Sequence, residues 1–357
     1  MTKTSPENSC TPVSEWPAVD REAWLRALEP RDRFNTAPKL ATRWQRSTQI
    51  AIANGYGRWL GWLDRGRMLE PGVPAGERAT RDVVRAYYEA LQKLGLADYT
   101  IAGRINQLGK ALSVLEPDSD FGWINRAASR LFAKAKPRRD VRAIMQPPEA
   151  ILALGLDLMQ EAEEGRFRTH LDRATLFRDG LMLCLLVQRP LRLANLTELT
   201  LGRDLEFHDA WRIRIEDDQT KSGRAIECDW PIAIADHLER YLAVHRPALL
   251  KRRAAVSRAG RLWISKQGGP MTAGAVAFQV RTRTKDEFGA AINPHSFRHI
   301  AATAIATADP THSAAIAGVL GHSSLSASEK YYNRAQVLGA AERMHAGLDN
   351  FRSGEGR

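Results

Sequence analysis

The sequence predicts a mostly α-helical protein that carries a small antiparallel β-sheet. Residues 39–136 show apolar residues at helical spacing and contain no run that alternates as a strand does. Alternation appears later, in WRIRIED (211–217), and RAIECDWPI (224–232) is a second strand candidate. The segment between them, DQTKSG (218–223), contains the Asp, Ser and Gly typical of a hairpin connection. The strands are therefore expected in the second half of the chain only.

The first part of the chain predicts a small all-α domain behind a polar start. Residues 1–38 form a polar, proline-containing N-terminal extension with one short helix expected over 20–30. The domain itself spans 39–136, and its four helices are expected over 40–63, 80–95, 99–117 and 120–136. The second of these begins with a threonine, Thr80, which suits a helix cap, and ends at a glycine.

A basic segment, AKAKPRRDVRAIMQPPEA (133–150), follows this domain and contains two lysines, three arginines and three prolines. Its composition indicates an inter-domain linker over 137–147. A solvated connector without a partner is one interpretation. Because the cations suit a phosphate backbone, we expect DNA contacts from Lys134, Lys136, Arg138, Arg139 and Arg142.

The pattern beyond the linker predicts an α-rich domain over 148–351 that carries the sheet, followed by a short tail, 352–357. Its helices are expected over 149–162, 167–188, 234–248, 272–287, 296–308, 312–319 and 325–349. The stretch QVLGAAERMHAGLDNF (336–351) has apolar residues at helical spacing. Two interpretations of this last helix stay open: packing on its own domain, and docking on a neighbouring copy.

Charge and composition restrict the class of protein. The net charge is +11, which favours a polyanionic partner, although solubility alone would also explain it. Three widely spaced cysteines give neither a disulfide framework nor a zinc-binding spacing. The apolar run GLMLCLLV (180–187) is too short to span a bilayer, and the N-terminus lacks a secretory signal. We therefore expect a cytoplasmic protein without membrane contact.

Three segments carry residues suited to phosphate chemistry. In NPHSFRHIAATAIATA (293–308), His295 and Arg298 fall at i and i+3 on one helix face. Arg192 lies between two leucines, and a guanidinium held there is pre-organised for an anion. Lys221 is at the tip of the expected hairpin, where a solvated lysine is the usual case. A metal site at His295 and His299 lacks both an acidic residue between them and a third ligand, so no metal is expected.

Taken in order, these segments resemble the tyrosine recombinase (phage integrase) family. RPLRLANLTEL is similar to the family's first-arginine box, TKSGRAIECDWPI to its lysine hairpin and PHSFRHIAATAI to its HxxR box. GVLGHSSLSASEKYYNRA is similar to the histidine-to-tyrosine box. One box alone arises easily by chance, whereas four in the right order over 148–350 are specific. The resemblance implies an all-α core-binding (SAM-like) domain followed by an α+β tyrosine-recombinase catalytic domain with a C-terminal exchange helix.

The resemblance also implies six residues that act on a DNA phosphodiester: Arg192, Lys221, His295, Arg298, His322 and Tyr331. In the family the nucleophile lies nine residues after the histidine of the glycine-histidine pair, which gives Tyr331 rather than Tyr332. Adjacent side chains on a helix diverge by ~100°, so only one of the two faces the phosphate. The implied product is a 3′-phosphotyrosyl intermediate, formed without a metal, a cofactor or ATP.

The implied partner is double-stranded DNA with specific recombination sites, bound by a homo-tetramer, with accessory proteins as optional partners. Integration or excision of a mobile element in the nucleoid is the implied role. Three alternatives stay open: DNA relaxation by a type IB topoisomerase, a non-cutting DNA-binding protein on the same fold, and a helical scaffold.

Two positions depart from the family pattern. Asn195 stands where the family often has an acidic residue, so support for the pocket is expected from elsewhere, with Glu198 as the candidate. Pro190 replaces a common glycine and stiffens the turn before Arg192.

Overall fold

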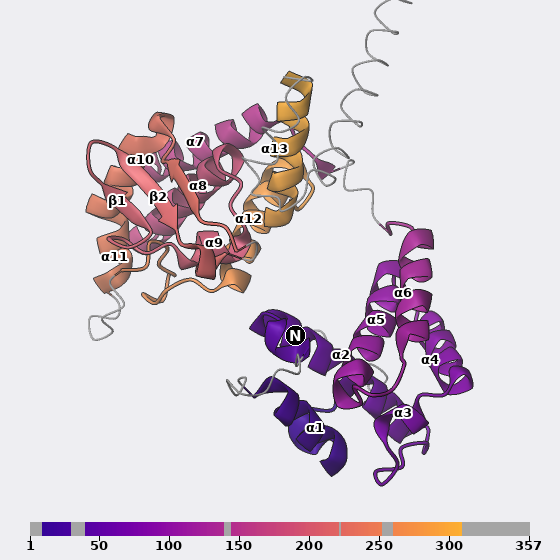
Figure 1. Cartoon of the computed structure of the whole chain (residues 1–357). Coiled ribbons are helices and arrows are strands. Elements are labelled where there is room, and N and C mark those ends of the chain that lie inside the picture. The colour runs from indigo at the N-terminus through magenta and orange to yellow at the C-terminus, as the bar shows by residue number, and fades with distance from the viewer. Residues whose placement is uncertain (1–8, 30–39, 139–143, 221–222, 252–259, 309–357) are drawn as a thin grey trace, which may run out of the picture. The chain divides into compact units, whose positions relative to one another are not determined.

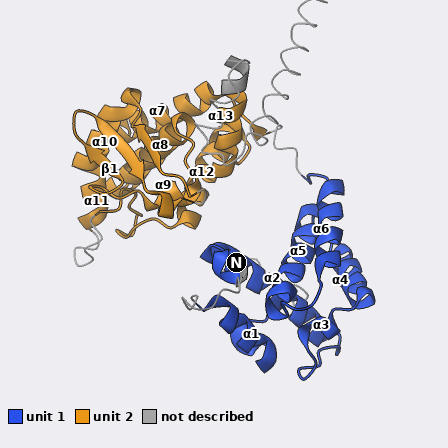
Figure 2. Ribbon diagram, in the orientation of Figure 1, with its two compact units in different colours: residues 1–140 blue, residues 141–357 orange. Residues whose placement is uncertain are grey.

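The structure, a computed structural model, describes residues 9–29, 40–138, 144–220, 223–251 and 260–308 (Figure 1). The chain divides into two compact units, 1–140 and 141–357 (Figure 2). The mostly helical fold with a small antiparallel sheet is confirmed, since strands occur in the second unit among the described residues. In the part of the chain that the structure describes, no helix is long and apolar enough to cross a bilayer.

The first unit is helical throughout its described residues. Its α-helices are α1 (Ala18–Leu28), α2 (Arg46–Arg65), α3 (Ala75–Arg78), α4 (Arg81–Lys93), α5 (Asp98–Leu115) and α6 (Gly122–Lys134). Thr80 caps α4, because its hydroxyl accepts a hydrogen bond from the Val83 backbone N–H at 3.4 Å. Gly95 follows α4 with a φ of 62°, a conformation that glycine adopts without strain. Both ends of α4 are thus set by the residues that the sequence indicates.

The N-terminal segment contributes to the core of this unit. Trp16 and Trp24 are buried, and their rings make an edge contact with each other. Between them, the carboxylate of Asp20 accepts hydrogen bonds from Tyr56 at 2.7 Å and from the Arg78 guanidinium at 2.6 Å. Residues expected to form a polar extension therefore supply two core tryptophans and the acidic partner of a buried ion pair to the helical unit.

The second unit combines its small sheet with a larger set of helices. They are α7 (Pro148–Glu164), α8 (His170–Gln188), α9 (Leu193–Glu198), α10 (Ala235–Arg240), α11 (Arg246–Leu250), α12 (Ala273–Phe288) and α13 (Pro294–Ala308). A π-helical turn, Tyr241–His245, joins α10 to α11. Strands β1 (Leu205–Phe207), β2 (Trp211–Ile215) and β3 (Ile226–Asp229) pair antiparallel in the order β1-β2-β3. The pairing of Ile215 with Ile226 confirms the expected antiparallel strand pair.

Helix α8 is the centre of the second unit. It is buried around most of its circumference over 176–186, as its nearly continuous apolar sequence requires. It packs closely on α7 where glycines of the two helices meet. A Cβ at Gly180 would lie 2.5 Å from the Gly155 carbonyl oxygen, and one at Gly155 would lie 2.4 Å from the sulfur of Cys184. This close approach fixes α8, the helix that leads into the turn before Arg192.

Gly180→Ala is expected to lower the free energy of unfolding of the second unit by about 1–3 kcal/mol, because the backbone of α7 must move away. Gly274→Ala is the matched control: Gly274 lies in the first turn of α12, and the contact that an added Cβ would make with the described side chains is to the Thr272 hydroxyl oxygen, at 3.9 Å. Urea unfolding followed by circular dichroism measures both. Equal stability of the two variants would contradict the close packing of α7 on α8.

Candidate active site

A short connection, residues 189–192, joins α8 to α9 and positions the first predicted arginine. Arg189 ends α8, and its backbone N–H donates to the Leu185 carbonyl at 2.7 Å. The Leu191 N–H then donates to the Arg189 carbonyl at 2.7 Å, which closes a γ-turn around Pro190. Arg192 follows as the N-cap residue of α9 and is half-buried. Its backbone is thus held by ordered structure on both sides.

Helix α13 brings the second predicted arginine to this turn. The helix starts at Pro294, and the side chain of Asn293 accepts a hydrogen bond from the His295 backbone N–H at 3.2 Å. One turn later, Arg298 is 7% exposed, and its Nη1 donates to the carbonyl oxygen of Pro190 at 2.8 Å. Two arginines that are far apart in the sequence are therefore anchored at one turn.

His295 is exposed at the start of α13, as a group that exchanges a proton with a bound substrate must be. Its ring and the ring of His299 make an edge contact, with centroids 5.1 Å apart. Among the described residues, no group of three or more His, Cys, Asp or Glu side chains is placed to hold a metal ion. In this part of the chain, the site therefore consists of cationic and imidazole groups.

The two departures from the family pattern have different surroundings. Asn195 is 5% exposed, and its Nδ2 has no hydrogen-bond partner among the described residues. Glu198 is exposed and pairs with Arg261. Its carboxylate is therefore engaged with the loop that precedes α12, and the expected role of Glu198 as support for the pocket stays a prediction. A cavity of about 410 Å³ lies beside Asn195, and its other lining residues are Ala194, Glu198, Arg203, Asp204, Ile215, Asp218 and Gln219.

Three predicted catalytic residues, Lys221, His322 and Tyr331, lie outside the described residues, as does the stretch 336–351. The structure describes the residues that flank Lys221, up to Thr220 and again from Gly223. On the near side of Lys221, the Thr220 hydroxyl donates to the Arg224 carbonyl at 2.8 Å and accepts from the Arg224 N–H at 3.1 Å. Thr220 thus closes the connection between β2 and β3 at its base.

The predicted DNA contacts begin at the C-terminal end of α6. Lys134, Lys136 and Arg138 are all exposed. The Lys136 backbone N–H donates to the Asp98 carboxylate at 3.1 Å, and the Arg138 guanidinium donates to the Gly95 carbonyl at 3.1 Å. These two bonds hold the start of the linker against the turn between α4 and α5. The other two predicted contacts, Arg139 and Arg142, lie outside the described residues.

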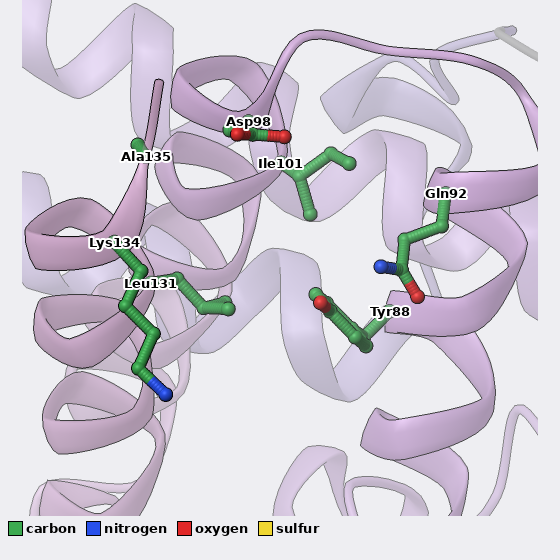
Figure 3. Close-up of a pocket in the computed structure, with 7 residues that line it drawn as sticks. All are labelled: Tyr88, Gln92, Asp98, Ile101, Leu131, Lys134 and Ala135. Carbon is green, nitrogen blue, oxygen red and sulfur yellow. The ribbon is translucent and has the colours of Figure 1, made fainter.

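Lys134 also borders a surface pocket of about 170 Å³ in the helical unit. Leu131 and Lys134 of α6 face Tyr88 and Gln92 of α4 across this pocket (Figure 3). Asp98, Ile101 and Ala135 complete its lining. The pocket is small and carries one cation and one carboxylate, so it does not form an anion-binding site by itself.

Sequence reasoning did not find a pair of arginines inside the helical unit. Arg58 of α2 and Arg104 of α5 both lie near Tyr87 of α4. Burial raises the pKa of Tyr87 to about 12, and the charges of Arg104 and Arg58 oppose that rise. The Tyr87 hydroxyl and the Arg58 Nε are buried without a partner among the described residues. The signal in the sequence was an arginine within the aromatic run GYGRWLGWL (55–63).

Comparison with known proteins places this chain in a family. No curated protein matches it by sequence. Among solved structures, XerA recombinase is similar at 16% identity and a TM-score of 0.39, over 91% of this chain and 98% of that chain. XerH site-specific recombinase bound to palindromic difH substrate, a post-cleavage complex, is similar at 16% identity and a TM-score of 0.44, over 94% and 99%. Its pre-cleavage complex with difH is similar at 17% identity and a TM-score of 0.43, over 93% and 99%.

The family comparison covers the unit that carries the candidate site. The model of the phage integrase family matches residues 157–337, which is just over half of the chain. The matched range includes the turn with Arg192, the strand pair around Lys221, the helix with Arg298 and the segment with Tyr331. The chain therefore belongs to the phage integrase family.

Proposed function

We propose that this protein is a site-specific DNA recombinase that cleaves and rejoins DNA through a 3′-phosphotyrosyl intermediate. One observation carries the proposal: the hydrogen bond from Arg298 to the Pro190 carbonyl anchors Arg298 at the turn that ends in Arg192. A phosphodiester that is being cleaved carries charge on two non-bridging oxygens. Guanidinium groups, with their fixed planar donors, are suited to bind both.

In the proposed reaction, the phenolic oxygen of Tyr331 attacks the phosphorus, and the bond from phosphorus to the 5′-oxygen breaks. A phenol with a pKa of ~10 is a weak nucleophile near neutral pH, so the attack needs a proton acceptor. His295, exposed at the start of α13, is assigned that role. Lys221 donates a proton to the leaving 5′-oxygen, and His322 donates a hydrogen bond to the phosphate. Arg192 and Arg298 stabilise the charge of the transition state.

The reverse reaction rejoins the strand without ATP. The 5′-hydroxyl of the same or another strand attacks the phosphotyrosine, so the number of phosphodiester bonds is unchanged. In this proposal the two arginines supply the positive charge that Mg²⁺ provides in many nucleases. Four copies on two recombination sites would carry out strand exchange. Integration or excision of a mobile element in the cytoplasmic nucleoid is the biological role proposed for it.

A trapping experiment tests the function. The protein is mixed, in buffer with EDTA, with a nicked DNA substrate made from the ends of the element that carries the gene. A covalent protein–DNA band on a denaturing gel is the expected result. Transfer of the trapped strand to a second site distinguishes a recombinase from a topoisomerase. Binding to the same DNA without any covalent band would instead identify a non-cutting DNA-binding protein.

Replacement of Lys134, Lys136 and Arg138 together by glutamine is expected to weaken DNA binding most at low salt. Each phosphate contact that is lost lowers the slope of log K against log salt concentration by about 0.9, so a total decrease of roughly 2–3 is expected. Filter binding at several salt concentrations measures it. Arg85→Gln is the control, since Arg85 is an exposed arginine of the same unit that pairs with Asp82 at 3.5 Å. The same slope in the triple variant and in wild type would show that Lys134, Lys136 and Arg138 do not contact DNA phosphates.

A further inference from the structure

The carbonyl group of Pro190 is the point at which the two arginines of the candidate site are joined. Pro190 is buried, and its oxygen accepts the hydrogen bond from Arg298 Nη1 at 2.8 Å. Arg192 begins α9 only two residues later, and the Leu196 N–H donates to the Arg192 carbonyl at 2.9 Å. A rotation of the Pro190 peptide unit would therefore change the position of the Arg298 guanidinium relative to the backbone of Arg192.

The proline ring restricts that rotation. It fixes φ near −65°, which is close to the −75° of an inverse γ-turn, and the turn closed by Leu191 and Arg189 is centred on Pro190. A proline also disfavours the helical conformation in the residue before it. Arg189 accordingly has φ −132° and ψ 90°, and α8 ends there. A glycine at position 190 would permit many more orientations of the same carbonyl.

Neighbouring contacts hold the rest of the turn. The Arg189 side chain donates to the Asp229 carbonyl at 3.2 Å and to the Gln188 carbonyl at 3.2 Å. The turn is thus attached to the end of β3, which is one strand of the pair whose connection contains Lys221. Pro190 lacks an N–H group, so its position in the turn leaves no backbone donor unsatisfied. Within this restrained segment, the proline carbonyl accepts a hydrogen bond from Arg298.

We propose that Pro190 is a positioning residue that orients its carbonyl oxygen toward Arg298 and so sets the distance between Arg298 and Arg192. The use of that distance to bind a scissile phosphate rests on the proposed function. The hydrogen bond itself is a property of the protein without DNA. The proposal therefore has two consequences that are measured separately: restricted motion of the Arg298 guanidinium, and a faster cleavage step.

Pro190→Gly tests the first consequence in the DNA-free protein. Arginine side chains labelled with ¹⁵N give separate signals for the Nη protons when a guanidinium is held by hydrogen bonds. Arg298→Lys identifies the signals of Arg298 by their loss. In wild type these signals are expected to be resolved, and in Pro190→Gly they are expected to merge. Resolved signals in Pro190→Gly would overturn the proposal, whatever the protein does to DNA.

The second consequence is tested with the trapping substrate. Pro190→Gly is expected to form the covalent adduct roughly 10- to 100-fold more slowly than wild type, because a misplaced catalytic group has an effect of this size. DNA affinity is expected to stay unchanged. An unchanged cleavage rate would overturn the proposed positioning role. A wild-type protein that forms no adduct would refute the proposed function, and the signals of Arg298 would still decide whether Pro190 holds it.

Pro231→Gly is the matched control in both experiments. Pro231 is a buried proline of the same unit, its φ is −59°, and its carbonyl accepts a backbone hydrogen bond from Ile234 at 3.0 Å. Both substitutions increase the conformational freedom of the unfolded chain in the same way. A decrease in cleavage that also occurs in Pro231→Gly would reflect general destabilisation and would overturn the assignment to Pro190. Thermal unfolding of both variants confirms that they are folded during the assays.

Discussion

Tyr331→Phe is expected to abolish the covalent protein–DNA adduct, whereas Tyr332→Phe should retain it. The phenylalanine lacks the oxygen that would form the bond to phosphorus. Loss of a catalytic nucleophile typically reduces a rate by on the order of 10⁴-fold or more. On a denaturing gel with a nicked suicide substrate, the Tyr331→Phe lane should therefore contain free DNA only.

The two variants together also determine the register. The sequence places Tyr331 nine residues after His322, and side chains of adjacent residues on a helix diverge by ~100°. Binding of the same DNA by Tyr331→Phe, measured by gel shift, shows that the variant is folded. An adduct that disappears only with Tyr332→Phe would assign the nucleophile to Tyr332. Adducts with both variants would mean that neither tyrosine is the nucleophile.

Local sequence patterns predicted the elements that local physics determines. The threonine cap and the terminal glycine of α4 lie where the sequence indicates, because capping requires only neighbouring residues. The antiparallel pairing of β2 and β3 followed from alternation and from a connection rich in turn residues. In contrast, the predicted helix over 234–248 contains a π-helical turn at Tyr241–His245. Tyr241 and His245 at the two ends of that turn are both buried, and no local pattern in the sequence indicated the turn.

Contacts between segments that are far apart in the sequence could not be predicted from local patterns. Trp16 and Trp24 lie in a polar segment, yet they fill the helical core, since a few apolar residues suffice to anchor a segment. Glu198, which the sequence suggests as a support for the catalytic pocket, pairs with Arg261 of a distant loop, and no local pattern indicates that contact. The contact that carries the site joins a side chain, Arg298, to a backbone carbonyl. Every residue has a backbone carbonyl, so the sequence does not indicate which one accepts this hydrogen bond.

Arg298→Lys is expected to reduce the rate of adduct formation by about 10²–10³-fold, which corresponds to about 2.7–4 kcal/mol of transition-state stabilisation. The reason is geometric. Lysine keeps the positive charge but lacks the planar fork, so it cannot donate to the Pro190 carbonyl and bind a phosphate oxygen in the same orientation. DNA affinity is expected to change little, because the phosphate contact strengthens in the transition state rather than in the ground state.

Arg281→Lys serves as the control, since Arg281 is exposed on α12 of the same unit and makes no described contact with the turn at Pro190. Burial of Arg298 makes a stability check necessary, so thermal unfolding of both variants accompanies the kinetics. Single-turnover cleavage at saturating protein separates the chemical step from binding. A wild-type rate for Arg298→Lys would show that a point charge is sufficient at this position. The planar donor geometry of Arg298 and its pairing with Pro190 would then not be required for cleavage.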